Sequence, residues 1–347
     1  MKNSEISWTN HTFNPWIGCT KVSPGCLNCY AENETFARVQ RAAGRELWGK
    51  GQLRYRTSAE YWNEPVKWNK EAEVFPWCPQ AGPYSKANRP KVFCGSMCDW
   101  LDDEVPIEMF VDLLRLQFQC KHLDWLNLSK RIENWMPRIE QALIVANGGD
   151  STDKSWFEKH GDSFPKDEFA EWLNDWTGGK SPSNVWIGAT AENQEIADRR
   201  IPELLKIPAK VRFLSCEPLL GPINLDDLQK TDDPGVHHYS CLECDVDPRD
   251  DGDWHGKTVN WVIVGGESGP KARPCNVDWM RSIVGQCKAA GVAPFVKQVG
   301  DNAWLEPGEH EKIRVTPGYR PLKAKAGRDP LEWPEDLRVQ EFPNDIH

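Results

Sequence analysis

Short apolar runs recur along the chain in the pattern typical of buried strands. They cover residues 8–16, 91–95, 125–129, 185–190, 211–216, 261–266 and 295–298. Amphipathic segments at 107–120, 193–205 and 278–290 lie between several of these runs and predict helices. Because strand and helix alternate, the pattern predicts an α/β fold with a parallel sheet of six or seven βα units.

Polar or small residues follow each predicted strand. The carboxyl ends of parallel strands meet at one edge of a barrel or open sheet, so we expect these side chains to converge on one site. Singly, each residue has a simpler explanation as a cap of the next helix. The strand-end residues are Ser96, Asp99, Lys130, Arg131, Thr190, Glu192, Asn193, Glu217, Glu267, Ser268, Lys297 and Gln298.

Two polar segments interrupt this alternation, at 147–183 and 226–257. We assign residues 1–304 to one α/β domain that carries both segments as insertions, and 305–347 to a C-terminal extension in which we find no chemistry. A helical pattern near 166–176 lies in the first insertion. The second contains Cys241-x2-Cys244 and nearby histidines, which suit zinc, although a single C-x2-C pair is equally compatible with a loop that binds no metal.

Composition favours an intracellular protein with reduced thiols. The chain has 347 residues, 39% of them hydrophobic, and lacks both an apolar run of 18 residues and an N-terminal signal pattern, so we expect a soluble, cytoplasmic protein with no membrane partner. Its 12 cysteines are then expected to be free or metal-bound rather than disulfide-bonded. The net charge of −10 argues against nucleic-acid binding through the whole surface, but is compatible with a local basic patch.

Three of the cysteines lie close together in a C-x6-C-x2-C pattern. Cys19, Cys26 and Cys29 follow the first apolar run, on a loop that contains Pro24 and two glycines. Structural zinc and [4Fe–4S] clusters each normally take four protein ligands. Three thiolates on a cluster would leave one iron open to another ligand, whereas a structural zinc site would need a distant His or Cys. The residues alone leave both interpretations open.

This motif and other landmarks resemble the radical S-adenosylmethionine (SAM) superfamily, and more narrowly a group of phage-encoded proteins distantly related to spore photoproduct lyase. The commonest superfamily spacing is C-x3-C-x2-C, with an aromatic residue where this chain has Asn28; we expect Tyr30 to take over the contact of that aromatic with adenine. The resemblance extends over residues 5–300, and its further landmarks are Asn14-Pro15-Trp16, Gly95-Ser96-Met97, Ser129-Lys130-Arg131, Ser215-Cys216-Glu217-Pro218-Leu219-Leu220, Gly265-Gly266-Glu267-Ser268-Gly269-Pro270 and Lys297-Gln298.

The resemblance implies a partial parallel (β/α)6–7 barrel of radical SAM type, with a [4Fe–4S] cluster on the three cysteines and SAM on its open iron. A one-electron donor such as flavodoxin or ferredoxin would reduce the cluster, which cleaves SAM to a 5′-deoxyadenosyl radical. Lys130 or Arg131 suits the SAM carboxylate by charge. Glu267, in a Gly-Gly-Glu turn after the sixth strand, is a candidate for the SAM amine or the substrate. The remaining candidates to bind SAM are Ser96, Asp99, Thr190, Glu192 and Glu217.

Cysteines near strand ends are candidates for catalysis. Three cysteines lie near strand ends, Cys94, Cys98 and Cys216, and one of them could return a hydrogen atom to a substrate radical, as a cysteine does in spore photoproduct lyase. Our catalytic candidates are Cys98, Cys216 and Glu217. Buried free cysteine is also common and unreactive.

A basic stretch with interleaved aromatics covers residues 38–56. This stretch contains six basic residues and one acidic residue, Glu46, and Trp48 and Tyr55 lie among them in the sequence. This composition fits a surface for phosphates and stacked bases, and it fits a solvated helix face and loop equally well. The candidates for nucleic-acid contact are Arg38, Arg41, Arg45, Arg54 and Arg56.

Together with the phage resemblance, the basic stretch favours a nucleobase in DNA as substrate, which must be flipped out of a duplex to reach such a site. Two concrete reactions are isomerisation of an amino-acid-modified thymine in phage DNA, in the host cytoplasm, and a lyase-type repair. A peptide or small-metabolite substrate is an alternative. A different class of function is a non-enzymatic nucleic-acid-binding or adaptor protein stabilised by zinc or a cluster.

Overall fold

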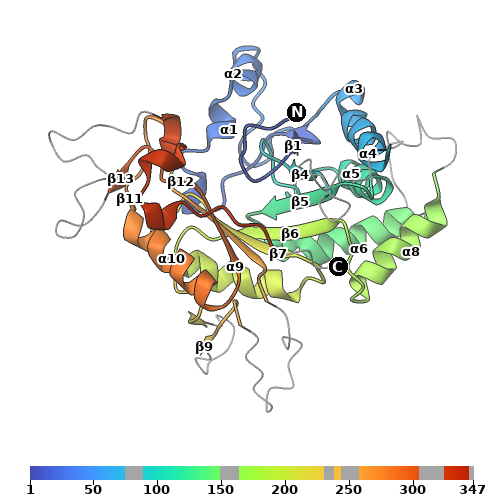
Figure 1. The fold of residues 1–347 in the computed structure, drawn as a ribbon. Coiled ribbons are helices and arrows are strands. Elements are labelled where there is room, and N and C mark those ends of the chain that lie inside the picture. The colour runs from blue at the N-terminus through green and yellow to red at the C-terminus, as the bar shows by residue number, and fades with distance from the viewer. Residues whose placement is uncertain (75–88, 149–163, 230–237, 244–257, 305–323, 344–347) are drawn as a thin grey trace.

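A curled sheet of seven parallel strands forms a half-barrel at the centre of the protein (Figure 1). The computed structural model describes residues 1–74, 89–148, 164–229, 238–243, 258–304 and 324–343. In spatial order the strands are β1 (His11–Phe13), β4 (Lys91–Cys94), β5 (Asp124–Ser129), β6 (Val185–Thr190), β7 (Arg212–Cys216), β10 (Trp261–Gly265) and β12 (Ala293–Gln298).

The spatial order of these strands repeats their order in the chain. Each crossover therefore adds its strand on the same side of the preceding one, and the order has no reversal of the kind found in doubly wound sheets. Right-handed crossovers that all run in one direction place their helices on one face and curl the sheet. The predicted α/β fold with a parallel sheet is confirmed, and the order favours the barrel arrangement over the open, doubly wound one.

Helices cover the outer, convex face of the sheet. Helices α6, α8, α9 and α10 lie along one side of it in Figure 1, and α8 lies within the segment that the sequence presents as an insertion. Its residues Phe169, Leu173 and Trp176 are fully buried, so α8 is part of the outer layer. In the described part of the chain, the helices of 12 or 13 residues are α5 (Ile107–Gln119), α6 (Trp135–Ala146), α8 (Lys166–Thr177), α9 (Gln194–Lys206) and α10 (Val277–Ala289).

Shorter elements connect this frame. The helices among them are α1 (Tyr30–Asn33), α2 (Thr35–Ala42), α3 (Ala59–Trp62) and α4 (Glu64–Val74). The 3-10 turns are η1 (Pro24–Cys26), η2 (Ile132–Asn134), η3 (Lys325–Gly327), η4 (Pro330–Glu332) and η5 (Glu335–Leu337). Three small sheets pair β2 (Trp16–Ile17) with β3 (Tyr55–Arg56), β8 (Leu228–Gln229) with β9 (His238–Tyr239), and β11 (Cys275–Asn276) with β13 (Ala303–Trp304).

The first apolar run, 8–16, does not form one strand as the sequence predicts. Only His11–Phe13 joins the sheet, and Trp16–Ile17 leaves it to pair with Tyr55–Arg56. Pro15 separates the two pieces, and proline has no N–H to donate to a ladder. The chain therefore turns away from the sheet just before the cysteine loop.

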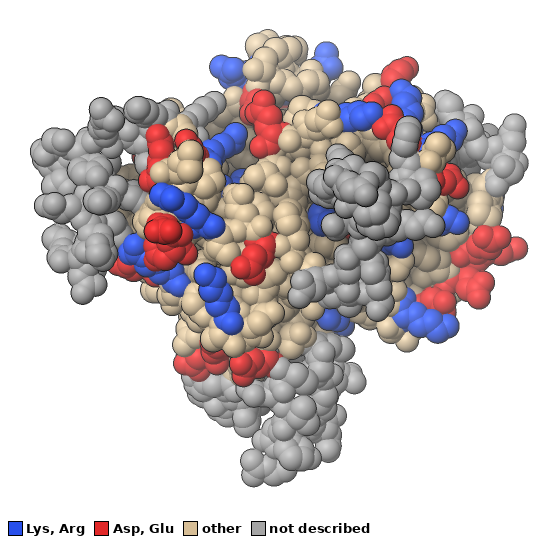
Figure 2. Space-filling model, in the orientation of Figure 1, with Lys and Arg blue, Asp and Glu red and all other residues tan. Residues whose placement is uncertain are grey.

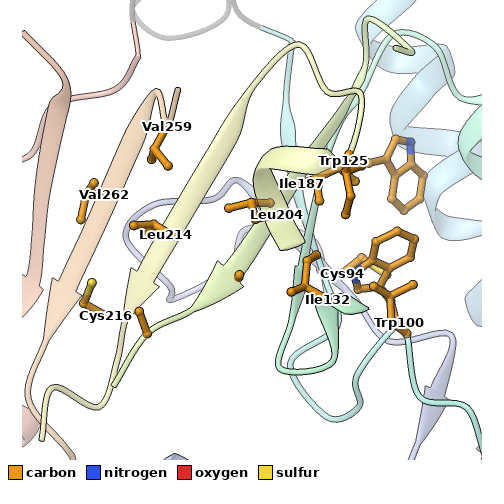
Figure 3. Close-up of a cluster of buried hydrophobic side chains, with 14 of the residues drawn as sticks. Cys94, Trp100, Trp125, Ile132, Ile187, Leu204, Leu214, Cys216, Val259 and Val262 are labelled. Carbon is orange, nitrogen blue, oxygen red and sulfur yellow. The ribbon is translucent and has the colours of Figure 1, made fainter. Parts of the chain in front are cut away.

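The outer face of the sheet packs on the helices in one large apolar core (Figure 3). Trp125, Ile187, Leu214 and Val262 each point into it from a different strand and are fully buried. Side chains alternate between faces along a strand, so their neighbours face the concave side. Both faces are covered, which explains why the strands read as nearly continuous apolar runs.

The concave side holds a second, mostly aromatic cluster. Phe213 lies over Gly188, where a Cβ atom would overlap its ring. By alternation, Thr190, Ser215 and Lys297 share this concave face and follow the cluster towards the carboxyl ends of their strands. The cluster therefore forms an apolar floor beneath the strand ends; its members are Trp8, Phe93, Leu126, Trp186, Val211, Phe213, Trp261, Ile263 and Phe295.

Both outer edges of the sheet are paired with nearby chain. Lys2 forms an antiparallel bridge with His11 on β1, and Gln340 forms one with Phe295 on β12. Phe342, in the same C-terminal segment, packs on Trp261 and Phe295. The predicted C-terminal extension thus closes one side of the half-barrel. No helix among the described residues is long and apolar enough to span a membrane.

Candidate functional site

The cysteine loop lies across the carboxyl ends of several strands. Arg131, just after β5, donates hydrogen bonds to the Cys19 sulfur (3.4 Å) and to the carbonyl oxygen of Thr20 (2.5 Å). Tyr30, just after the loop, donates from its hydroxyl to the carbonyl oxygen of Ser96, beyond β4 (2.7 Å). The cysteine loop therefore lies beside residues from the ends of β4 and β5, at the edge of the sheet where the sequence predicts a site.

Asp99 organises the environment of Cys19. Its carboxylate accepts hydrogen bonds from the Ser129 hydroxyl (2.7 Å), the Lys130 backbone N–H (2.9 Å) and the Arg131 guanidinium (3.1 Å). Burial raises the pKa of the Cys19 thiol to about 12, although the Arg131 charge works in the opposite direction. Arg131 is therefore hydrogen-bonded to both Cys19 and Asp99, and Asp99 holds the guanidinium group in position beside the sulfur.

Two glutamates from more distant strand ends contact the segment around Cys26. Glu192, after β6, accepts from the Ser23 hydroxyl (2.6 Å) and from the guanidinium of Arg200 on α9 (2.9 Å). Burial raises the pKa of the Glu192 carboxyl, but the charges of Lys130 and Arg200 outweigh it and the net pKa is lowered. Glu192 is therefore ionised, fully buried and already paired.

Glu267, after β10, is likewise bonded both to an arginine and to the cysteine loop. Arg273 donates to both of its carboxylate oxygens (2.9 and 2.6 Å), and the amide of Asn28 donates to one of them (3.1 Å). A further guanidinium nitrogen of Arg273 reaches the carbonyl oxygen of Pro24 (2.8 Å). Burial opposes ionisation, yet the bonds from Arg273 and Asn28 lower the pKa of Glu267 overall.

An ion pair crosses the concave face at the far end of the sheet. The ammonium group of Lys297 on β12 lies 2.9 Å from a carboxylate oxygen of Glu217, which follows β7. The intervening strand β10 carries Gly265 at this level, where a Cβ atom would lie 2.6 Å from that carboxylate. Thr190 lies deeper, and its hydroxyl accepts from Arg200 (2.7 Å).

Lys130 is the strand-end base with an uncommitted side chain. No hydrogen bond or ion pair involves its ammonium group among the residues that the structure describes, and its charge acts on Glu192. It is half-buried, at the carboxyl end of β5. An ammonium group in this position is suited to an anionic group such as a carboxylate.

The structure does not bring every predicted residue to this site. Cys216 is fully buried in the core between sheet and helices (Figure 3), on the opposite face of β7 from Phe213 and Ser215. Cys98 lies nearer the loop, beside Gly95, where a Cβ atom would overlap its sulfur. Of the two candidate cysteines, only Cys98 is on the side of the cysteine loop.

Two of the five arginines proposed for nucleic-acid contact are paired with buried acids. Arg54 is buried and bonded to Asp102 (2.7 Å) and Glu104. Arg56 pairs with the buried Asp112 (2.8 Å) and lies over the ring of Trp62. For Arg54 the prediction of a nucleic-acid contact is wrong, because its side chain is fully buried against an acid from a distant part of the chain. For Arg56, which is paired but 27% exposed, it stays a prediction.

The other three arginines are exposed, on α2 and the loop after it. Arg41 pairs with Glu46 (3.0 Å), and the predicted stacking residue Trp48 is buried in a small cluster with Leu47. On the face drawn in Figure 2, basic and acidic side chains are interspersed. The basic surface is thus smaller than the sequence predicts, and it consists of Arg38, Arg41, Arg45 and Lys50.

The residues present suit an iron–sulfur cluster by their donor chemistry. Cys19, Cys26 and Cys29 are free thiols on one loop at the mouth of the half-barrel. Within the described ranges, no group of three or more His, Cys, Asp or Glu is arranged to hold a single metal ion. In a [4Fe–4S] cluster each cysteine binds a different iron, so the sulfurs do not converge on one point.

Of the possible zinc pair in the second insertion, Cys244 lies outside the described residues. Its partner Cys241 is fully buried in the main apolar core.

One family model matches residues 3–329, that of the family described as "Protein of unknown function (DUF5131)". The chain belongs to this family. The matched range contains the cysteine loop, all seven strands of the half-barrel, and both Glu–Arg pairs. No curated protein and no solved structure shows a significant match to the chain.

Sequence reasoning missed the partners of the strand-end acids. The candidates from the sequence do not include the four residues that donate hydrogen bonds to Glu192 and Glu267, which are Arg200, Arg273, Ser23 and Asn28. For Arg273 a signal existed, since it follows Glu267 by six residues in a loop with Gly269 and Pro270. Arg200 gave no signal, because an arginine on an amphipathic helix normally faces solvent.

Proposed function

We propose that this protein is a radical SAM enzyme that holds a [4Fe–4S] cluster on Cys19, Cys26 and Cys29. The observation that carries the proposal is the position of three free thiols on a loop tied by side-chain hydrogen bonds to the carboxyl ends of β4, β5, β6 and β10. This is the end at which parallel barrels build their active sites. When bound, the cluster supplies the electron that cleaves SAM and so generates a radical.

The side chains around the site would position the cluster ligands, provide charges for SAM and the substrate, and exclude water. Arg131 and Asp99 fix Cys19, and the uncommitted ammonium group of Lys130 is suited to the carboxylate of SAM. The aromatic floor of the half-barrel keeps water from the concave side beneath the site. Glu217 and Lys297 face the same space and are the charged groups placed to orient a substrate.

The first experiment is anaerobic purification and reconstitution, with iron, sulfide and zinc analysis and an absorption spectrum. We expect about four irons per chain and a brown protein, and loss of both in Cys26→Ala. Cys287→Ala, which changes a buried cysteine in α10, is the matched control and should keep its iron. Stoichiometric zinc with no iron would instead support a metal-stabilised binding or adaptor protein.

For the substrate we propose a nucleobase in DNA, supported by the exposed bases Arg38, Arg41 and Arg45 on the side of the cysteine loop. If these residues meet phosphates, replacing all three by Glu should abolish DNA binding at low salt, and binding by the wild type should weaken as salt rises. Iron content should stay unchanged in the variant. Cluster-dependent SAM cleavage without DNA affinity at any salt would point to a peptide or small-molecule substrate.

A further inference from the structure

Two buried carboxylates from the ends of two different strands bracket Cys26. Glu192 contacts the loop at Ser23, three residues before this cysteine, and Glu267 contacts it at Asn28, two residues after it. The two glutamates come from the ends of β6 and β10, which β7 separates in the sheet. The short turn η1, with Cys26 at its end, is thus held on both sides by residues distant in the sequence.

Each carboxylate is held in place by its own arginine. Arg200 is 1% exposed and reaches Glu192 from α9, while Arg273 makes a two-point contact with Glu267. Arg273 also donates directly to the loop, at the carbonyl oxygen of Pro24. A carboxylate that is already ion-paired and hydrogen-bonded in this way is a fixed acceptor for a loop and a poor acceptor for a diffusing ligand.

The loop sequence is fitted to this contact. Gly25 lies directly against Glu192, and a Cβ atom at this position would overlap the carboxylate. Ser23 and Asn28 supply the short donors that reach the two glutamates. Steric fit and hydrogen bonding therefore act on the same few residues around one cysteine.

We propose that Glu192 and Glu267 are positioning residues that clamp the loop around Cys26, and that they do not bind SAM. The inference uses the proposed function only in the role given to the cysteines, because the clamp acts in the protein without its cluster. Cys19 is fixed separately, by Arg131 at the end of β5. Loss of the clamp should therefore affect Cys26 more than Cys19.

The test is the rate at which iodoacetamide alkylates each cysteine in the cluster-free protein, read by peptide mass spectrometry. Cys26 is buried in the intact loop. In Glu192→Ala and Glu267→Ala we expect its alkylation to accelerate about tenfold or more, since each change removes a charge-assisted hydrogen bond to the loop. Cys287 reports global unfolding and should not change. The matched control is Glu203→Ala, which removes an exposed ion pair with Lys206 on α9.

Two further sets of variants keep the test decisive if the buried glutamates prove necessary for folding. Ser23→Ala and Asn28→Ala remove the donors on the loop and leave the Glu–Arg pairs intact, so they should reproduce the exposure of Cys26. Glu267→Gln keeps an acceptor for Asn28 and should show partial rescue. After reconstitution, the Ala variants should hold less iron than wild type, with an altered electron paramagnetic resonance spectrum of the reduced cluster.

Three results would overturn the clamp. One is unchanged alkylation of Cys26 in all the variants. Another is equal acceleration at Cys26 and Cys287, which would mean that the glutamates stabilise only the fold. The third is loss of SAM binding, measured by calorimetry, with Cys26 still protected. If the protein holds zinc in place of iron, the proposed function fails, while the alkylation result still decides the clamp.

Discussion

Arginine partners decide which acidic side chains remain available at the mouth of the half-barrel. Asp99, Glu192 and Glu267 are each bonded to an arginine, whereas Glu217 is paired with a lysine on the concave face. A lysine is a flexible point charge that exchanges partners more readily than the planar guanidinium group. At the residue scale, Glu217, Lys297 and Lys130 are therefore the charged groups best placed to meet a ligand.

Replacing Arg54 tests its reassignment from the surface to the interior. Its guanidinium and the Asp102 carboxylate are both fully buried, so Arg54→Met leaves a buried acid without its base. We expect the free energy of unfolding to fall by about 3–5 kcal/mol. Urea unfolding measures this loss, and the exposed Arg45→Met should stay within about 0.5 kcal/mol of wild type. Wild-type stability in Arg54→Met would restore a surface role.

His11 gives the protein a stability that depends on pH. Burial lowers its pKa from 6.5 to about 4, and the amino terminus and Lys2 add to this shift. The unfolded chain therefore binds a proton at a higher pH than the folded one, so the contribution of neutral His11 is complete above about 6.5 and is lost as the pH falls towards 4.

The measurement for His11 is urea unfolding at several pH values between 7.5 and 4. Wild type should lose stability across this range more steeply than His11→Gln, which cannot titrate. Parallel curves for the two proteins would show that His11 titrates alike in the folded and unfolded states.

Sequence reasoning reached the strand ends but not the directions of single side chains. Ser129, Thr190 and Glu217 could be placed at strand ends because each follows an apolar run. The sequence does not show that Cys216 points into the core, since a strand buried on both faces has no alternation to reveal which way each residue points. The ion pair of Arg54 was not visible either, because its partner Asp102 is 48 residues away in the chain.

At the scale of elements, β6 and β7 fit together through a glycine that faces a phenylalanine on the neighbouring strand. Gly188 on β6 leaves the space that the Phe213 ring of β7 fills in the concave cluster. Each added methyl group on this face would push the ring away from its aromatic neighbours. The small residue in an otherwise bulky strand is thus a consequence of packing.

Gly188→Ala should therefore destabilise the protein, by about 1–3 kcal/mol, because the methyl group overlaps the Phe213 ring. The matched control is Gly285→Ala in α10, where nothing lies within 4 Å of the added atom. That change should stabilise by about 0.5–1 kcal/mol, the usual gain for alanine over glycine in a helix. The two midpoints of urea unfolding should move in opposite directions; equal shifts would contradict the packing argument.

At the scale of the whole molecule, a half-barrel has two problems that a closed barrel avoids. Its first and last strands expose unpaired backbone groups, and its concave side is open. Here Lys2 pairs with β1, and the C-terminal segment pairs with β12 and covers part of the aromatic cluster. The C-terminal segment, in which the sequence indicates no catalytic or binding residues, thus covers the edge of β12 and part of the aromatic cluster.

Deleting residues 338–347 should uncover this edge. The deletion removes the bonds from Val296 N–H to Val339, from Trp261 Nε1 to Glu341 (2.8 Å) and from Glu341 N–H to Pro294, together with the packing of Phe342. We expect a loss of at least about 2 kcal/mol in urea unfolding, since each bond contributes about 1 kcal/mol. Light scattering should also reveal self-association through the free edge of β12, which Leu331→Ala, at a residue that is 78% exposed, should not cause. If the truncated protein stays monomeric and as stable as wild type, the C-terminal segment is not needed to protect the edge of β12.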